Sequence, residues 1–81
     1  MAELPGGVVH DLPQDFAEAL RADEPALATW QDITPLARNE WICWVEDAKK
    51  AETRSKRIRW GTENLNAGKR RPCCWPGCKH R

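Results

Sequence analysis

The last residues of the chain, "RPCCWPGCKHR", bring together side chains that could bind a metal or react with an oxidant. Three thiols and one imidazole lie within eight positions, and they belong to Cys73, Cys74, Cys78 and His80. Three thiolates and one histidine make up the ligand set of many structural zinc sites. The sequence therefore offers zinc as a candidate cofactor of this C-terminal segment.

Two other interpretations of the same segment stay open. Adjacent side chains point apart, so Cys73 and Cys74 would share one ion only across a tight turn, which Pro76 and Gly77 favour. Nearby Arg and Lys side chains favour the thiolate form, so a redox-active cysteine is a second hypothesis. A basic tail without fixed structure is the third.

The length and composition of the chain limit the kinds of structure that can position these residues. Its 81 residues suffice for one domain. No run approaches the ~18 apolar residues of a membrane-spanning helix. The N-terminal stretch has acids where a secretory signal has bases, and it lacks an apolar stretch of sufficient length. We therefore expect a cytoplasmic protein with reduced thiols, which favours metal binding or catalysis over structural disulfides.

Charge is distributed unevenly although the net charge is only +1. Residues 1–34 hold seven acids and one base, Arg21, whereas residues 35–81 hold twelve bases and five acids. The two halves could pack together and neutralise each other. Alternatively, the basic half could present a surface to an anionic partner.

Four short helices are predicted from apolar periodicity and from capping residues. The first two cover about 13–22 and 25–32, each with a proline in its first turn. Either Asp23 or Glu24 can cap the second. The third begins at Pro35 after a Thr34 cap and is expected to close at Lys49 and Lys50.

The fourth helix starts near Ala51 and stops at Gly68. Its apolar face is rotated away from that of the third, which requires a turn near residues 49–52. Trp30, Trp41 and Trp44 are the expected heavy core residues. Cys43, away from the apolar stripe of the third helix, is expected to be a small inert filler. Gly61 lies mid-helix and is expected to weaken the fourth helix by ~1 kcal/mol relative to alanine.

The predicted fold is therefore an all-α bundle of about four short helices with flexible termini. Residues 1–11 are expected to form a flexible leader, residues 12–71 the domain and residues 72–81 the tail. The proline at position 72 argues against a fifth helix in the tail.

The segments "LPQDFAEAL", "WICWVEDAKKAETRSKRI" and "LNAGKR" resemble the YdeI/OmpD-associated family, also called bacteriocin-protection proteins. The most specific part is Trp44 to Lys50, followed by "ETR" at 52–54 and "RI" at 57–58. The resemblance covers roughly residues 11–71, with Ala51 where the family often has proline. It implies a small helical domain and a link to envelope stress and porins, but no defined reaction.

An interaction patch is predicted on the fourth helix and on the basic residues that flank it. Its members are Lys49, Glu52, Thr53, Arg54, Lys56, Arg57, Trp60, Lys69, Arg70 and Arg71. We expect a protein partner. The alternative is nucleic acid, since basic residues interleaved with an exposed aromatic can hold phosphate and stack a base.

Enzymatic activity is not expected from this sequence. It has no phosphate-cradling glycine loop and no serine paired with a base, and its histidines, His10 and His80, both lie outside the predicted helical domain. The function expected from the sequence is a non-enzymatic accessory or interaction domain.

Overall fold

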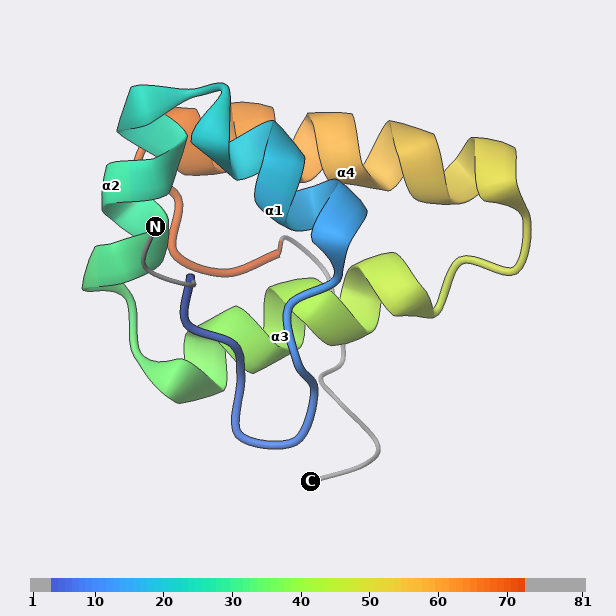
Figure 1. The fold of residues 1–81 in the computed structure, drawn as a ribbon, viewed down its shortest axis with the longest axis horizontal. Coiled ribbons are helices and arrows are strands. Elements are labelled where there is room, and N and C mark those ends of the chain that lie inside the picture. The colour runs from blue at the N-terminus through green and yellow to red at the C-terminus, as the bar shows by residue number, and fades with distance from the viewer. Residues whose placement is uncertain (1–3, 73–81) are drawn as a thin grey trace.

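The computed structural model describes residues 4–72, which form four helices (Figure 1). They are α1 (Gln14–Arg21), α2 (Glu24–Asp32), α3 (Pro35–Glu46) and α4 (Ala51–Asn66). The longest helix, α4, contacts each of the other three. Within the described range there is no strand, and the predicted all-α class is confirmed.

The starts of α2 and α3 follow the predicted capping residues. The Asp23 carboxylate accepts a hydrogen bond from the backbone N–H of Ala26 at 3.2 Å, and the Thr34 hydroxyl accepts one from Ala37 at 3.1 Å. Each side chain thereby satisfies an N–H that has no partner within its helix. A proline occupies the first turn of both helices, as predicted.

The turn between α3 and α4 lies where the sequence placed it, but α3 ends earlier than expected. Its last residue is Glu46, and Lys49 and Lys50 lie exposed in the turn instead of closing the helix. The N–H of Ala48 donates to the Val45 carbonyl at 3.2 Å, so the last turn tightens before the chain leaves the helix. Lys50 is extended, and α4 begins at Ala51 without the proline often found there.

The end of α4 confirms the role predicted for Gly68. This glycine has a φ of +86°, in the region that side chains with a Cβ rarely adopt. The N–H of Gly68 donates to the Leu65 carbonyl, and the N–H of Lys69 donates to the Asn64 carbonyl. This pair of bonds is a Schellman ending, which turns the chain back toward the bundle.

The core is built on the predicted tryptophans. Trp30 and Trp41 are fully buried, and Trp44 is 7% exposed. The rings of Phe16 and Trp30 lie 5.2 Å apart, and those of Trp41 and Trp44 are edge to face at 5.7 Å. Each such pair adds about 0.5–1.5 kcal/mol to the effect of area burial.

The helix α3 is buried on every side from residue 37 to residue 45. The sequence predicted burial of only one apolar stripe of this helix. Arg38, Asn39 and Glu40 are buried with the apolar residues, and Cys43 is buried as expected of a filler. The cause lies outside the helix, because residues 4–12 cover the side that the pattern assigned to solvent.

Residues 4–11, part of the predicted leader, make defined contacts with the helices. The Pro5 carbonyl accepts a hydrogen bond from the Trp30 indole at 2.8 Å, and the Gly6 carbonyl accepts one from Arg38 Nε at 2.9 Å. Leu4 and Leu12 pack against the core. The segment has no periodic pattern because it crosses the core as a loop, held by backbone groups.

No helix in the described part of the chain is long and apolar enough to cross a membrane.

Candidate interaction surface

A groove of about 380 Å³ lies between α3 and α4 and gathers the central part of the predicted patch. Thr53, Lys56, Arg57 and Trp60 line it from α4, and Trp44 lines it from α3. The four α4 residues share one face because they lie three, four and seven positions apart. Trp44, predicted only as a core residue, thus also contributes to the surface.

Trp60 is the most exposed large aromatic side chain within residues 4–72. It is 49% exposed, and its ring centroid lies 5.4 Å from that of Trp44, at an interplanar angle of 52°. One side of the ring is therefore supported by the core while the rest faces solvent. Such support fixes the ring before any partner arrives.

Arg57 is held firmly in the wall of the groove. Its Nη1 donates a hydrogen bond to the Trp44 carbonyl at 2.6 Å, and its guanidinium carbon lies 5.4 Å from the centre of the Trp44 ring. A weaker contact joins it to Asp47 at 3.9 Å. The carbonyl, the ring and the carboxylate together fix the direction of this cation.

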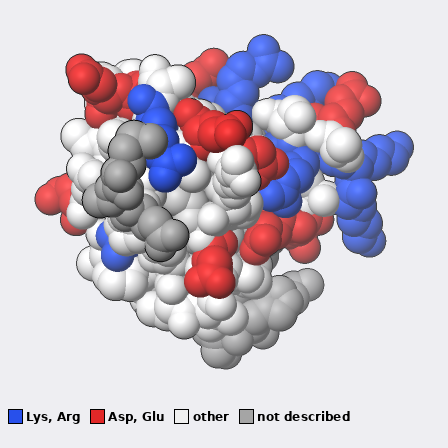
Figure 2. Space-filling view, viewed as in Figure 1, with Lys and Arg blue, Asp and Glu red and all other residues white. Residues whose placement is uncertain are grey.

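Lys56 is only loosely engaged beside Arg57. Its ammonium lies 3.5 Å from the Glu52 carboxylate, four positions earlier, and both side chains are largely exposed. Exposed ion pairs of this kind contribute only a few tenths of a kcal/mol to stability, so Lys56 or Glu52 can leave the pair to contact another group. Lys49, in the α3–α4 turn, is exposed. Figure 2 shows Lys and Arg side chains gathered at the end of the molecule where α4 begins, with acidic side chains between them.

Arg54 belongs to a different contact, although the sequence grouped it with Glu52 and Thr53. Its guanidinium donates two hydrogen bonds to the Asp15 carboxylate, at 2.8 and 3.0 Å. These bonds hold the pKa of Asp15 below its ordinary value, and the pKa of Arg54 is raised by the same partner. The pair joins α4 to α1.

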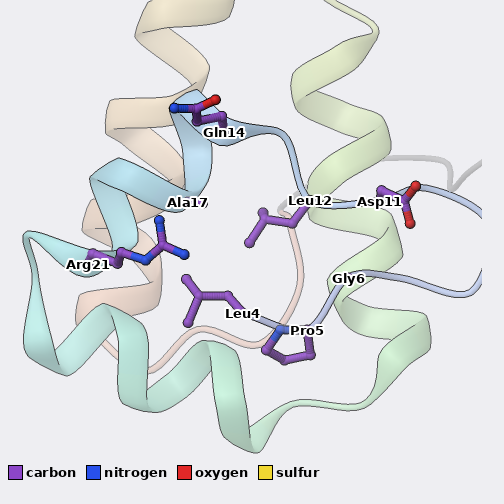
Figure 3. Close-up of a pocket in the computed structure, with 8 residues that line it drawn as sticks. All are labelled: Leu4, Pro5, Gly6, Asp11, Leu12, Gln14, Ala17 and Arg21. Carbon is purple, nitrogen blue, oxygen red and sulfur yellow. The ribbon is translucent and has the colours of Figure 1, made fainter. Parts of the chain in front are cut away.

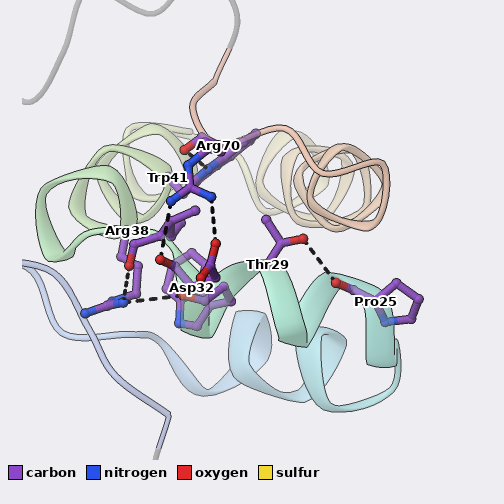
Figure 4. Close-up of polar contacts among 8 residues, drawn as sticks. Pro25, Thr29, Asp32, Arg38, Trp41 and Arg70 are labelled. Atoms are coloured by element: carbon purple, nitrogen blue, oxygen red, sulfur yellow. Dashed lines mark hydrogen bonds and ion pairs between the residues drawn. The ribbon is translucent and has the colours of Figure 1, made fainter.

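The last three members of the predicted patch follow the end of α4, away from the groove. Arg70 donates to the Asp32 carboxylate at 2.8 Å, and its own carbonyl accepts from the Trp41 indole at 3.1 Å (Figure 4). Lys69 and Arg71 are exposed. Eight of the ten predicted residues thus fall into a groove, an α1–α4 clamp and a segment bound to α2 and α3. Of the other two, Glu52 pairs with Lys56 and Lys49 lies in the α3–α4 turn.

The candidate zinc ligands Cys73, Cys74, Cys78 and His80 lie outside the described residues, so zinc binding stays a prediction. Among residues 4–72 there is no group of three or more His, Cys, Asp or Glu side chains placed to hold a metal ion.

The fold and this groove define a small all-α domain with a supported aromatic surface. Residues 10–68 match the family described as Bacteriocin-protection, YdeI or OmpD-Associated. This match covers well over half of the chain, which therefore belongs to that family, as the resemblance indicated. It includes all four helices and ends at Gly68. No curated protein and no solved structure matches the chain.

Proposed function

We propose that this chain is a non-enzymatic accessory domain that binds a protein partner through the α3–α4 groove. Its place in a bacteriocin-protection family suggests that the partner belongs to the response against such toxins or to envelope stress. The observation that carries the proposal is Trp60, which is half exposed yet supported by Trp44 and flanked by the fixed Arg57.

The chemistry of the groove suits a protein partner. Tryptophan and arginine are the residues most enriched among those that dominate binding energies at protein interfaces. Because Trp60 and Arg57 already have structural contacts, little side-chain entropy remains to be lost on association. An apolar side chain of the partner would pack on the open face of Trp60, with Lys56 at the rim available to a carboxylate.

Nucleic acid is favoured less by these contacts. Arg54 and Arg70 already bind carboxylates of the acidic half, through Asp15 and Asp32. Phosphates would have to displace these partners, whereas a protein contact at Trp60 leaves both ion pairs intact. The groove is consequently a better candidate binding surface than the basic residues taken together.

The test compares Trp60→Ala with Val8→Ala, since Val8 is the most exposed large hydrophobic side chain among residues 4–72. Proteins that co-purify with each tagged variant are quantified, and the affinity for the identified partner is then measured with both components purified. We expect Trp60→Ala to weaken binding about 30-fold, as a residue worth about 2 kcal/mol would. Val8→Ala should leave the affinity unchanged.

Thermal melts of both variants establish that they remain folded. Equal affinity of Trp60→Ala and wild type for the partner would exclude the groove as the binding surface. Binding of DNA or RNA that falls steeply with added salt would favour the alternative instead, because salt dependence reports the release of counterions from phosphates.

A further inference from the structure

A second hollow, of about 820 Å³, lies between the N-terminal segment and α1 (Figure 3). Its size falls within the ~300–1,000 Å³ of small-molecule sites. Leu4, Pro5, Leu12 and Ala17 supply the apolar part of its wall. Gln14 and Arg21 supply polar groups from α1. It is separate from the α3–α4 groove and shares no residue with it.

The walls of this hollow are held in place by the rest of the fold. The carbonyls of Pro5 and Gly6 accept hydrogen bonds from Trp30 and Arg38. Ala17 is buried in α1, and Leu4 and Leu12 pack against the core. A ligand would therefore enter a largely formed site, without the cost of ordering a loop.

Arg21 is the charged group that gives the hollow a chemical preference. It is the one base among residues 1–34, which hold seven acids, yet it makes no ion pair or hydrogen bond with any described side chain. Figure 3 shows its guanidinium directed toward Leu4 and Leu12. Asp15 binds Arg54 and Asp23 caps α2, and no described acid forms an ion pair with Arg21.

We propose that the hollow binds an organic monocarboxylate with an apolar body. Arg21 would hold the carboxylate, for which the planar guanidinium offers two parallel N–H donors. The apolar body would lie against Leu4, Leu12 and Ala17. Asp11, which also lines the hollow, disfavours a second negative charge on the ligand. Two sources share this chemistry, a free small acid and the C-terminal carboxylate of a peptide.

The test titrates the full chain with hexanoate and follows the backbone amide resonances by NMR. Hexanamide, which has the same shape without the charge, is the matched ligand control. A short peptide ending in leucine is compared with its C-terminal amide. We expect saturable shifts at α1 and at residues 4–12, with hexanoate or the free-acid peptide binding at least about tenfold more tightly than its amide.

Variants of the arginine establish which residue is responsible. Arg21→Ala should abolish the difference between acid and amide, and Arg21→Lys should retain only part of it. Arg59→Ala, at another exposed arginine, should leave binding unchanged. Equal binding of acid and amide, persistence of the acid preference in Arg21→Ala, or no binding by any ligand would each overturn the proposal. A preference for the peptide over hexanoate would identify a polypeptide terminus as the source.

Discussion

Asn39 accepts two of the hydrogen bonds that hold the N-terminal segment in place. It is completely buried, and its Oδ1 accepts hydrogen bonds from the backbone N–H groups of Val9 and His10, at 3.0 and 2.9 Å. Its Nδ2 is buried and has no hydrogen-bond partner among the described residues. An asparagine inside a helix is expected to face water, so nothing local indicated this role. The partner is a loop some thirty positions away in the sequence.

Gly7 is the residue that permits this contact. A Cβ at position 7 would lie 2.4 Å from both the Cα and the Cβ of Asn39. Because the obstacle includes backbone, Gly7→Ala must displace the segment, and we expect a loss of about 1–3 kcal/mol in the free energy of unfolding. Chemical denaturation measures it. Val8→Ala, at an exposed neighbouring position, is the control and should change stability by less than about 0.5 kcal/mol.

At the scale of the helices, local sequence was most informative about where each one begins and ends. Asp23, Thr34 and Gly68 act within one turn of their own positions, so their effects can be predicted without knowledge of the fold. The burial of Arg38 and the course of residues 4–12 depend on contacts between distant segments. The groove could be predicted only in part. The helical period places Thr53, Lys56, Arg57 and Trp60 on one face of α4, but the contact with Trp44 depends on how α3 packs on α4.

Gly61 tests the difference between propensity and packing within α4. It was expected to weaken the helix, and the structure places it against Trp41 and Trp44, with 3.4–3.5 Å between a new Cβ and the rings. That is ordinary van der Waals contact, so a methyl group fits. We expect Gly61→Ala to increase the free energy of unfolding by up to about 1 kcal/mol and therefore to raise the melting temperature. Gly68→Ala, at positive φ, should lower it instead, and stabilisation by both changes would contradict this account.

The Asp15–Arg54 pair tests the link between α1 and α4 through its dependence on pH. The lowered pKa of Asp15 means that the folded state favours the carboxylate, so its stabilisation is present above the unfolded pKa of ~3.9. It is lost as the pH falls through the folded value. Because the Asp15 side chain is half exposed, the contribution stays below about 1 kcal/mol.

Asp15→Asn should therefore reduce the melting temperature at pH 7, and the difference from wild type should shrink below about pH 4. Glu63→Gln, which removes an exposed carboxylate without an ion pair among the described residues, should show no such trend. A difference that grows on acidification would indicate that Asp15 does not act as the carboxylate partner of Arg54.

Across the whole molecule, internal ion pairs neutralise part of the uneven charge distribution. Asp15 pairs with Arg54, and Asp32 with Arg70, so acids of the first half bind bases of the second. Asn66 adds a hydrogen bond to Asp23 at 2.8 Å. This agrees with the interpretation that the halves pack together. Lys49, Lys69 and Arg71 remain exposed, which leaves some basic surface for a partner.

The N-terminal segment tests how far the domain extends beyond its helices. The family match begins at residue 10, yet Pro5, Gly6 and Val9 supply backbone groups to Trp30, Arg38 and Asn39. Removal of residues 1–9 would break these bonds and expose the side of α3 that carries Arg38 and Asn39. Water would satisfy part of what is lost, so we expect a net cost of at least about 2 kcal/mol. For a domain whose total stability is on the order of 5–15 kcal/mol, that is a substantial fraction.

Denaturant unfolding of the chain without residues 1–9 should show a lower midpoint and, since less surface is buried, a smaller slope. Removal of residues 73–81, which leaves the buried Pro72 in place, is the matched truncation and should leave the bundle folded. If loss of the first nine residues left midpoint and slope unchanged, the segment would be an accessory to the fold and not a part of it.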